Sequence, residues 1–139
     1  MVIQEYTSEM KMKLLIGNFE ETLNEYFCEL FADASIETYF AEMDYELILK
    51  MEMFQPEAIL FITNNVQTTP GVTTASERNE KMYAVVAALK KYGKPIIALS
   101  TWGRDSIKNK YYDAGVDYYM KLPFDVEVLV KLVTSVGAQ

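Results

Sequence analysis

Five short segments rich in apolar, β-branched or aromatic residues, each followed by a segment with helical spacing, constrain the fold of this chain more than any other feature. The run at 58–62 reads Ala-Ile-Leu-Phe-Ile, and its lack of alternation is typical of a strand buried on both faces. The expected strands cover 13–16, 36–40, 58–62, 95–99 and 117–122. The expected helices cover 20–31, 76–92, 105–114 and 125–136, with one more that Asp44 caps and that ends before Pro56.

This order, a strand and then a helix repeated five times, predicts a parallel sheet with helices on both faces. We therefore expect an α/β, flavodoxin-like (βα)5 doubly wound sandwich with a five-stranded parallel sheet. The length of 139 residues fits one domain, which we place at 12–139 after a polar lead-in at 1–11. Ligands of such sheets bind at the carboxyl ends of the strands. We therefore look for a site at 17–21, 62–71, 100–104 and 122–124.

The composition excludes several classes of chemistry. The chain has no histidine, which excludes Ser-His-Asp and Cys-His catalysis and histidine-ligated zinc or haem. Cys28 is the single cysteine, so a disulfide within the chain is impossible. The formal net charge of −7 argues against direct nucleic-acid binding, and no apolar run is long enough to span a membrane. We expect a cytoplasmic protein that is not an enzyme, with no cofactor and no metal.

The expected strands one, three, four and five lie in four stretches with recognisable sequences. The clearest is 114–125, Ala-Gly-Val-Asp-Tyr-Tyr-Met-Lys-Leu-Pro-Phe-Asp, and the others are 13–16, 55–61 and 94–100. These stretches resemble, in the same order, segments of the receiver domains of two-component response regulators. The resemblance covers residues 12–136 and implies a receiver fold and a role in two-component signalling.

The same resemblance implies that the phosphorylation site is degenerate. The positions of the two metal-binding acids hold Asn18 and Phe19, and the position of the phosphoacceptor aspartate holds Ile62. Leu122 replaces the lysine that pairs with the phosphoryl group. Mg²⁺ needs oxygen ligands, and phosphoryl transfer to an acyl oxygen needs a carboxylate nucleophile. We therefore expect a pseudo-receiver with no catalytic residue.

Two further positions keep the residue types of the family, Ser100 at the hydroxyl switch position and Tyr119 at the aromatic switch position. Ser100 also fits a serine that closes a strand by bonding local backbone, and Tyr119 fits a packing role. Tyrosines gather on the fourth expected helix and the fifth strand, and they are Tyr111, Tyr112, Tyr118 and Tyr119. Consecutive helix positions cannot both face inward, so we expect one of the pair at 111 and 112 to be exposed.

We expect a phosphorylation-independent signalling and protein-interaction module. The resemblance implies that a protein partner, a second copy, or both would bind the face formed by the fourth helix, fifth strand and fifth helix. One alternative is a small-molecule sensor that uses the former active-site cleft. Its expected lining is Asn18, Phe19, Ile62, Thr63, Ser100 and Leu122. A third hypothesis has the least support: phosphorylation through Glu20 and Lys121, which are adjacent to the positions of the family's metal-binding acids and lysine. The polar loop at 63–75 is either a binding loop or a mobile connection.

Overall fold

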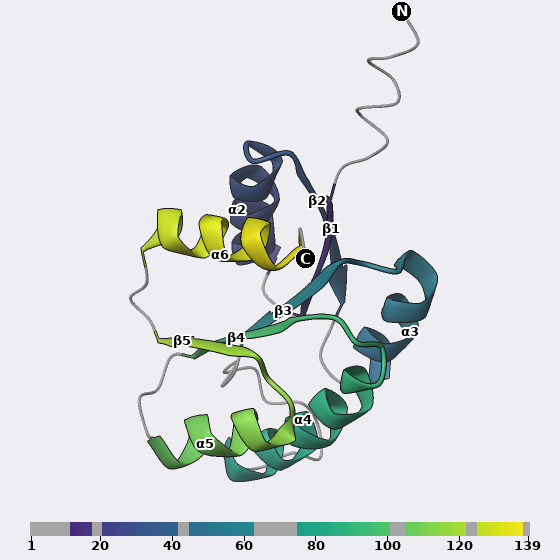
Figure 1. Cartoon of the computed structure of the whole chain (residues 1–139), viewed down its shortest axis with the longest axis vertical. Coiled ribbons are helices and arrows are strands. Elements are labelled where there is room, and N and C mark those ends of the chain that lie inside the picture. The colour runs from purple at the N-terminus through teal and green to yellow at the C-terminus, as the bar shows by residue number, and fades with distance from the viewer. Residues whose placement is uncertain are drawn as a thin grey trace, which may run out of the picture.

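The computed structural model describes residues 12–17, 21–41, 45–62, 75–100, 105–121 and 125–137. These residues form one five-stranded sheet in the order β2-β1-β3-β4-β5, and every pair of neighbouring strands is parallel. Helices cover both faces of the sheet (Figure 1). The prediction of a flavodoxin-like (βα)5 sandwich is confirmed.

The elements alternate along the chain as predicted. The strands are β1 (Met12–Gly17), β2 (Ile36–Ala41), β3 (Ala58–Ile62), β4 (Ile96–Ser100) and β5 (Tyr118–Lys121). The helices are α2 (Glu21–Ala32), α3 (Tyr45–Phe54), α4 (Ala75–Lys90), α5 (Asp105–Ala114) and α6 (Val126–Gly137). Within the described residues, no helix is long and apolar enough to cross a membrane.

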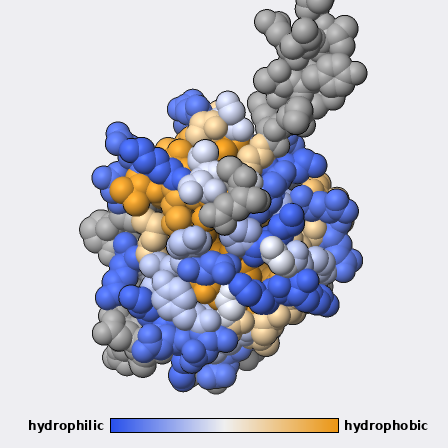
Figure 2. Space-filling model, in the orientation of Figure 1, coloured by the Kyte–Doolittle hydropathy of each residue, from blue (hydrophilic) through white to orange (hydrophobic). Residues whose placement is uncertain are grey.

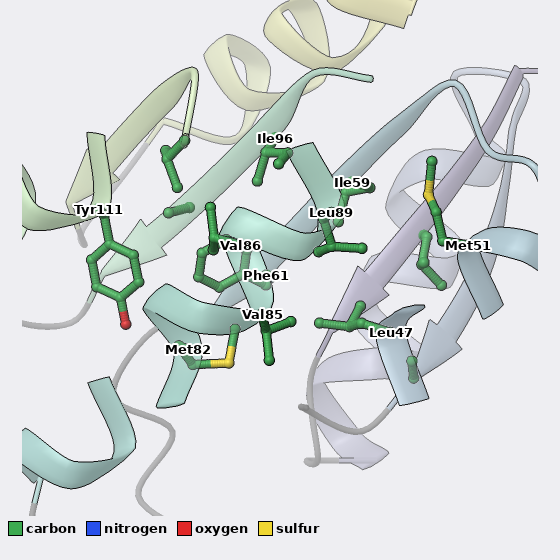
Figure 3. Close-up of a cluster of buried hydrophobic side chains, with 14 residues drawn as sticks. Leu47, Met51, Ile59, Phe61, Met82, Val85, Val86, Leu89, Ile96 and Tyr111 are labelled. Atoms are coloured by element: carbon green, nitrogen blue, oxygen red, sulfur yellow. The ribbon is translucent and has the colours of Figure 1, made fainter. Parts of the chain in front are cut away.

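The sheet separates two hydrophobic layers. Helices α2 and α6 cover one face, and α3, α4 and α5 cover the other (Figure 1). Successive strand residues point to opposite faces, so Ile59 and Phe61 pack under α4, whereas Leu60 and Ile62 pack toward α2 and α6. Figure 3 shows the cluster on the α4 side, which includes Leu47, Phe61 and Val86. Both faces of β3 and β4 are buried, which explains why these strands read as continuous apolar runs.

Two acidic residues hold the amino ends of the strands in register. The backbone N–H of Lys13 donates to the Glu57 carboxylate at 2.8 Å, and the N–H of Glu57 donates to the Lys13 carbonyl at 2.9 Å. The same reciprocal pair joins β4 to β5. The N–H of Ile96 donates to the Asp117 carboxylate at 2.8 Å, and the N–H of Asp117 donates to the Ile96 carbonyl at 2.9 Å. Each carboxylate thus accepts a backbone N–H at the start of the neighbouring strand, from the second residue of β1 and the first residue of β4.

Small differences from the expected elements have local causes. The helix predicted to reach Tyr92 ends at Lys90, because the N–H groups of Tyr92 and Gly93 turn back to the carbonyls three residues earlier. Gly93 then takes a φ of 70°, a conformation that favours glycine. On α3, Met51 lies in the core, whereas Met53 two residues later is 68 % exposed.

Candidate functional site

The carboxyl ends of the strands bring four candidate positions to one edge of the sheet. Gly17, Ile62, Ser100 and Lys121 are the last residues of β1, β3, β4 and β5. Ser100 lies directly beside Lys121 in the parallel ladder, and Ile62 lies beside Leu99. The candidate positions Asn18, Phe19 and Leu122 lie outside the described residues. The offset candidate Glu20 and the loop residues 63–74 also lie outside them.

Ile62 occupies the end of β3, where the resemblance expects a carboxylate. Its side chain is only 6 % exposed and belongs to the hydrophobic cluster beneath α2 and α6. An aliphatic side chain offers no lone pair to attack phosphorus and no oxygen to bind a metal. At this position the residue contributes buried apolar surface and no reactive or metal-binding group.

The neighbouring strand ends carry a hydroxyl and an ammonium group. Ser100 is fully buried at the end of β4, and it is the polar residue within the core of the described residues. Lys121 is exposed at the end of β5. Because side chains alternate along a strand, Lys121 shares the face of Tyr119, which packs against the cluster under α5. The offset lysine is therefore directed to the α5 side of the sheet.

Four aromatic rings form a contiguous cluster between α4, α5 and the sheet. The ring of Tyr111 meets that of Tyr83 edge-on at 4.6 Å between centroids and that of Phe61 at 5.8 Å. The ring of Tyr119 follows at 6.1 Å from that of Tyr111. Burial raises the pKa of Tyr111 far above its ordinary value, with a smaller effect from the neighbouring Tyr83 and Tyr119. Tyr111 therefore remains a neutral packing residue.

Tyr119 has one unusual feature. Its hydroxyl oxygen is buried and has no hydrogen-bond partner among the residues that the structure describes. A buried hydroxyl without a partner is unfavourable, because it has lost water and gained no bond. The ring of Tyr119 packs against two others: its centroid lies 6.1 Å from that of Tyr111 and 6.3 Å from that of Tyr112.

The four tyrosines proposed as an interaction surface divide between the core and the exterior. Tyr112 on α5 is 40 % exposed and Tyr118 on β5 is 36 % exposed. Tyr119 is half-buried, and Tyr111 is fully buried. The expectation that one of the adjacent pair faces outward is confirmed, but Tyr111 does not belong to the surface. Its spacing from Ile107 and Ala114, which pack on the same cluster, gave a signal for this orientation.

The described residues contain no group of three or more acidic or cysteine side chains arranged to hold a metal ion. Two cavities lined by described residues lie away from the carboxyl edge. One, of about 320 Å³, lies at the amino ends of the strands beside Glu57, Lys90 and Asp117. The other, of about 330 Å³, lies between α2 and α6 beside Leu30 and Val130. Neither cavity was predicted from the sequence, although the apolar residues of α6 extend beyond the three that are buried against the sheet.

Known structures share this architecture. A two-component response regulator from Clostridium difficile aligns over 93 % of this chain and 98 % of its own, with a TM-score of 0.76 and 15 % identity. The chemotaxis protein CheY4 of Vibrio cholerae aligns over 91 % of this chain and 98 % of its own, with a TM-score of 0.69 and 23 % identity.

A further similar structure is the signal receiver domain of a histidine kinase from Syntrophus aciditrophicus. It aligns over 91 % of this chain and 90 % of its own, with a TM-score of 0.72 and 17 % identity. The sequence matches no protein-family model and no curated protein sequence. The fold is therefore that of receiver domains, reached with a divergent sequence.

Proposed function

We propose that this chain is a pseudo-receiver, a phosphorylation-independent signalling and protein-interaction module of a two-component-type system in the cytoplasm. The observation that carries the proposal is Ile62, an aliphatic and almost fully buried residue at the carboxyl end of β3. A receiver that accepts a phosphoryl group needs a carboxylate oxygen there as the nucleophile. The receiver fold of the similar structures supports the assignment of this position.

Residue types at the neighbouring positions support the same conclusion. By the resemblance, Asn18 and Phe19 stand where two carboxylates would hold Mg²⁺, and Leu122 stands where a lysine would pair with the phosphoryl oxygens. Developing negative charge on a transferring phosphoryl group must be met by cations. With the nucleophile, the metal acids and the lysine all replaced, the edge retains a buried hydroxyl at Ser100.

We further propose that the module acts through the face formed by α5, β5 and α6. Tyr112 and Tyr118 place two partly exposed aromatic rings on this face, beside the edge strand β5. Tyrosine is enriched at protein interfaces because it contributes a large apolar area and a polar tip. A protein partner, a second copy of the chain, or both would bind there.

Beryllofluoride with Mg²⁺ mimics an acyl phosphate and tests the loss of phosphoryl chemistry. We expect amide NMR spectra of the labelled protein to show no saturable shift at Ile62, Ser100 or Lys121 beyond a salt control. A receiver domain that carries the phosphoacceptor aspartate serves as the positive control. A variant with Asn18→Asp, Ile62→Asp and Leu122→Lys, checked for folding, should gain shifts at these amides. Saturable shifts in the unmodified chain would falsify the proposal.

A further inference from the structure

A groove between α2 and α6 offers a second surface, separate from the tyrosines of the proposed function. It has a volume of about 330 Å³. Its apolar lining comes from the end of α2 and the turn after it, and from the first half of α6. These lining residues are Leu30, Ala34, Val126 and Val130. Figure 2 shows hydrophobic surface where α6 meets α2, bordered by hydrophilic side chains.

The groove exists because α6 is more apolar than its contact with the sheet requires. Only three of its residues, Leu129, Val133 and Val136, are buried. Val126 and Val130 lie one turn apart and flank that stripe on the side of α2, whereas Val128 is 51 % exposed on the opposite flank. A helix that is apolar well beyond its buried stripe commonly packs against a further element.

The border of the groove is acidic on the side of α2. The carboxylate that lines the groove there is that of Asp33, in the turn after α2. Glu29, exposed four residues earlier, adds a second negative charge near it. The helix Glu21–Ala32 contains no lysine or arginine, and its last turn therefore leaves the negative end of the helix dipole uncompensated. Glu127 adds a carboxylate from α6, beside the single cation of the lining, Lys131. An apolar floor with a mainly acidic border complements an apolar ligand with cationic flanks.

We propose that the α2–α6 groove binds an amphipathic helix of a partner protein. Its apolar side chains would recur every three or four residues and fill the groove, and its lysines or arginines would face the carboxylates of the lining, Asp33 and Glu127. This inference goes beyond the proposed function, because it uses a different surface and does not depend on the chemistry at Ile62. The protein would then carry two binding surfaces on opposite flanks of α6.

The probe is a synthetic peptide of leucine and lysine whose leucines occupy one face of a helix. Titrated into the full labelled chain, it should produce saturable amide shifts in 30–34 and 126–131. A peptide of the same composition, with its leucines distributed around the helix, should bind about tenfold more weakly, because it carries equal charge and no apolar face. Equal affinity for the two peptides would show that charge alone attracts them, and would overturn the proposal. Absence of binding, or shifts confined to other elements, would overturn it as well.

Two valines of α6 supply a matched pair of variants. Val130→Asp places a charge in the groove, and Val128→Asp places the same charge on the opposite flank of the same helix. We expect Val130→Asp to weaken peptide binding about tenfold or more, and Val128→Asp to leave it nearly unchanged. Equal losses would contradict the groove as the binding surface.

A third variant covers the case in which Val130→Asp does not fold. Ala34→Leu fills the groove without adding charge. It should weaken peptide binding while the circular dichroism spectrum stays that of the unmodified protein, and unchanged binding would overturn the proposal. Beryllofluoride binding reports on Ile62 separately, so failure of the groove and failure of the proposed function remain distinguishable.

Discussion

At the scale of single residues, the hydroxyl of Tyr119 is an unfavourable feature of the described core. It is buried without a partner, whereas the ring that carries it packs between Tyr111 and Tyr112. Burial of an unbonded hydroxyl costs roughly 1–3 kcal/mol, because the group loses its bonds to water. The ring contacts offset this cost, so the tyrosine is tolerated as a packing residue.

The substitution Tyr119→Phe should therefore stabilise the protein. It removes the unbonded oxygen and keeps the ring, and we expect the free energy of unfolding in urea to rise by about 1 kcal/mol. Tyr112→Phe is the control, because Tyr112 is 40 % exposed, and it should change stability little. A loss of stability in Tyr119→Phe would show that the hydroxyl has a bonding partner in solution.

Adjacent identical residues mark the limit of sequence reasoning at this scale. The sequence predicted that one of Tyr111 and Tyr112 faces outward, but two identical neighbours do not by themselves show which one. The choice follows from spacing along α5, because Ile107, Tyr111 and Ala114 share the face that packs on Phe61 and Tyr83.

The hydrogen bonds of the Glu57 and Asp117 side chains could not be predicted for another reason. Their role depends on which strands are neighbours, and this information is not local.

At the scale of elements, the amino ends of the strands are held by side chains as well as by the backbone ladder. Asp117 accepts the N–H of Ile96 at 2.8 Å and the ammonium group of Lys90 at 3.0 Å. The ion pair to Lys90 is partly exposed and contributes little in water. The bond to the Ile96 N–H matters more, because Ile96 is fully buried and a donor there needs an acceptor.

Asp117→Ala should accordingly destabilise the β4–β5 junction. We expect the free energy of unfolding to fall by about 1–3 kcal/mol, the usual cost of a buried donor left without a partner. Asp113→Ala is a suitable control, since it removes an equal charge from an exposed position on α5. Urea unfolding of the two variants measures the difference. Equal stabilities would mean that water replaces the carboxylate at no cost.

The central strands β3 and β4 were predictable because burial on both faces makes a strand an unbroken apolar run in the sequence. For this reason the strand Ala58–Ile62 was placed without error. Helix ends were less predictable, since they depend on single hydrogen bonds such as those that close the turn at Gly93. At the carboxyl edge, Ile62 and Ser100 lie where the sequence placed them, but Asn18, Phe19 and Leu122 remain predictions because they fall outside the described residues.

At the scale of the whole molecule, the exposed tyrosines predict association. Tyr112→Ala should weaken self-association, seen as concentration-dependent sedimentation, or capture of a partner protein, by about tenfold. Leu49→Ala is the control, because Leu49 is a large apolar residue that is 53 % exposed on α3, a helix that takes part in neither proposed surface. Equal losses in the two variants, or association that neither variant alters, would place the contact elsewhere.

The reciprocal bonds of Glu57 and Asp117 have a consequence for how such a protein can change over generations. Strand register is fixed at the amino edge, whereas the residues that would perform chemistry lie at the carboxyl edge. Mutations at the carboxyl edge therefore leave the side-chain bonds of Glu57 and Asp117 in place. Ile62 buries hydrocarbon at the carboxyl end of β3, where a charged or polar side chain would have to lose its water, and this burial favours the folded state. The architecture can thus accept an apolar residue at this edge without losing its shape, and its helical surfaces remain available to selection for new partners.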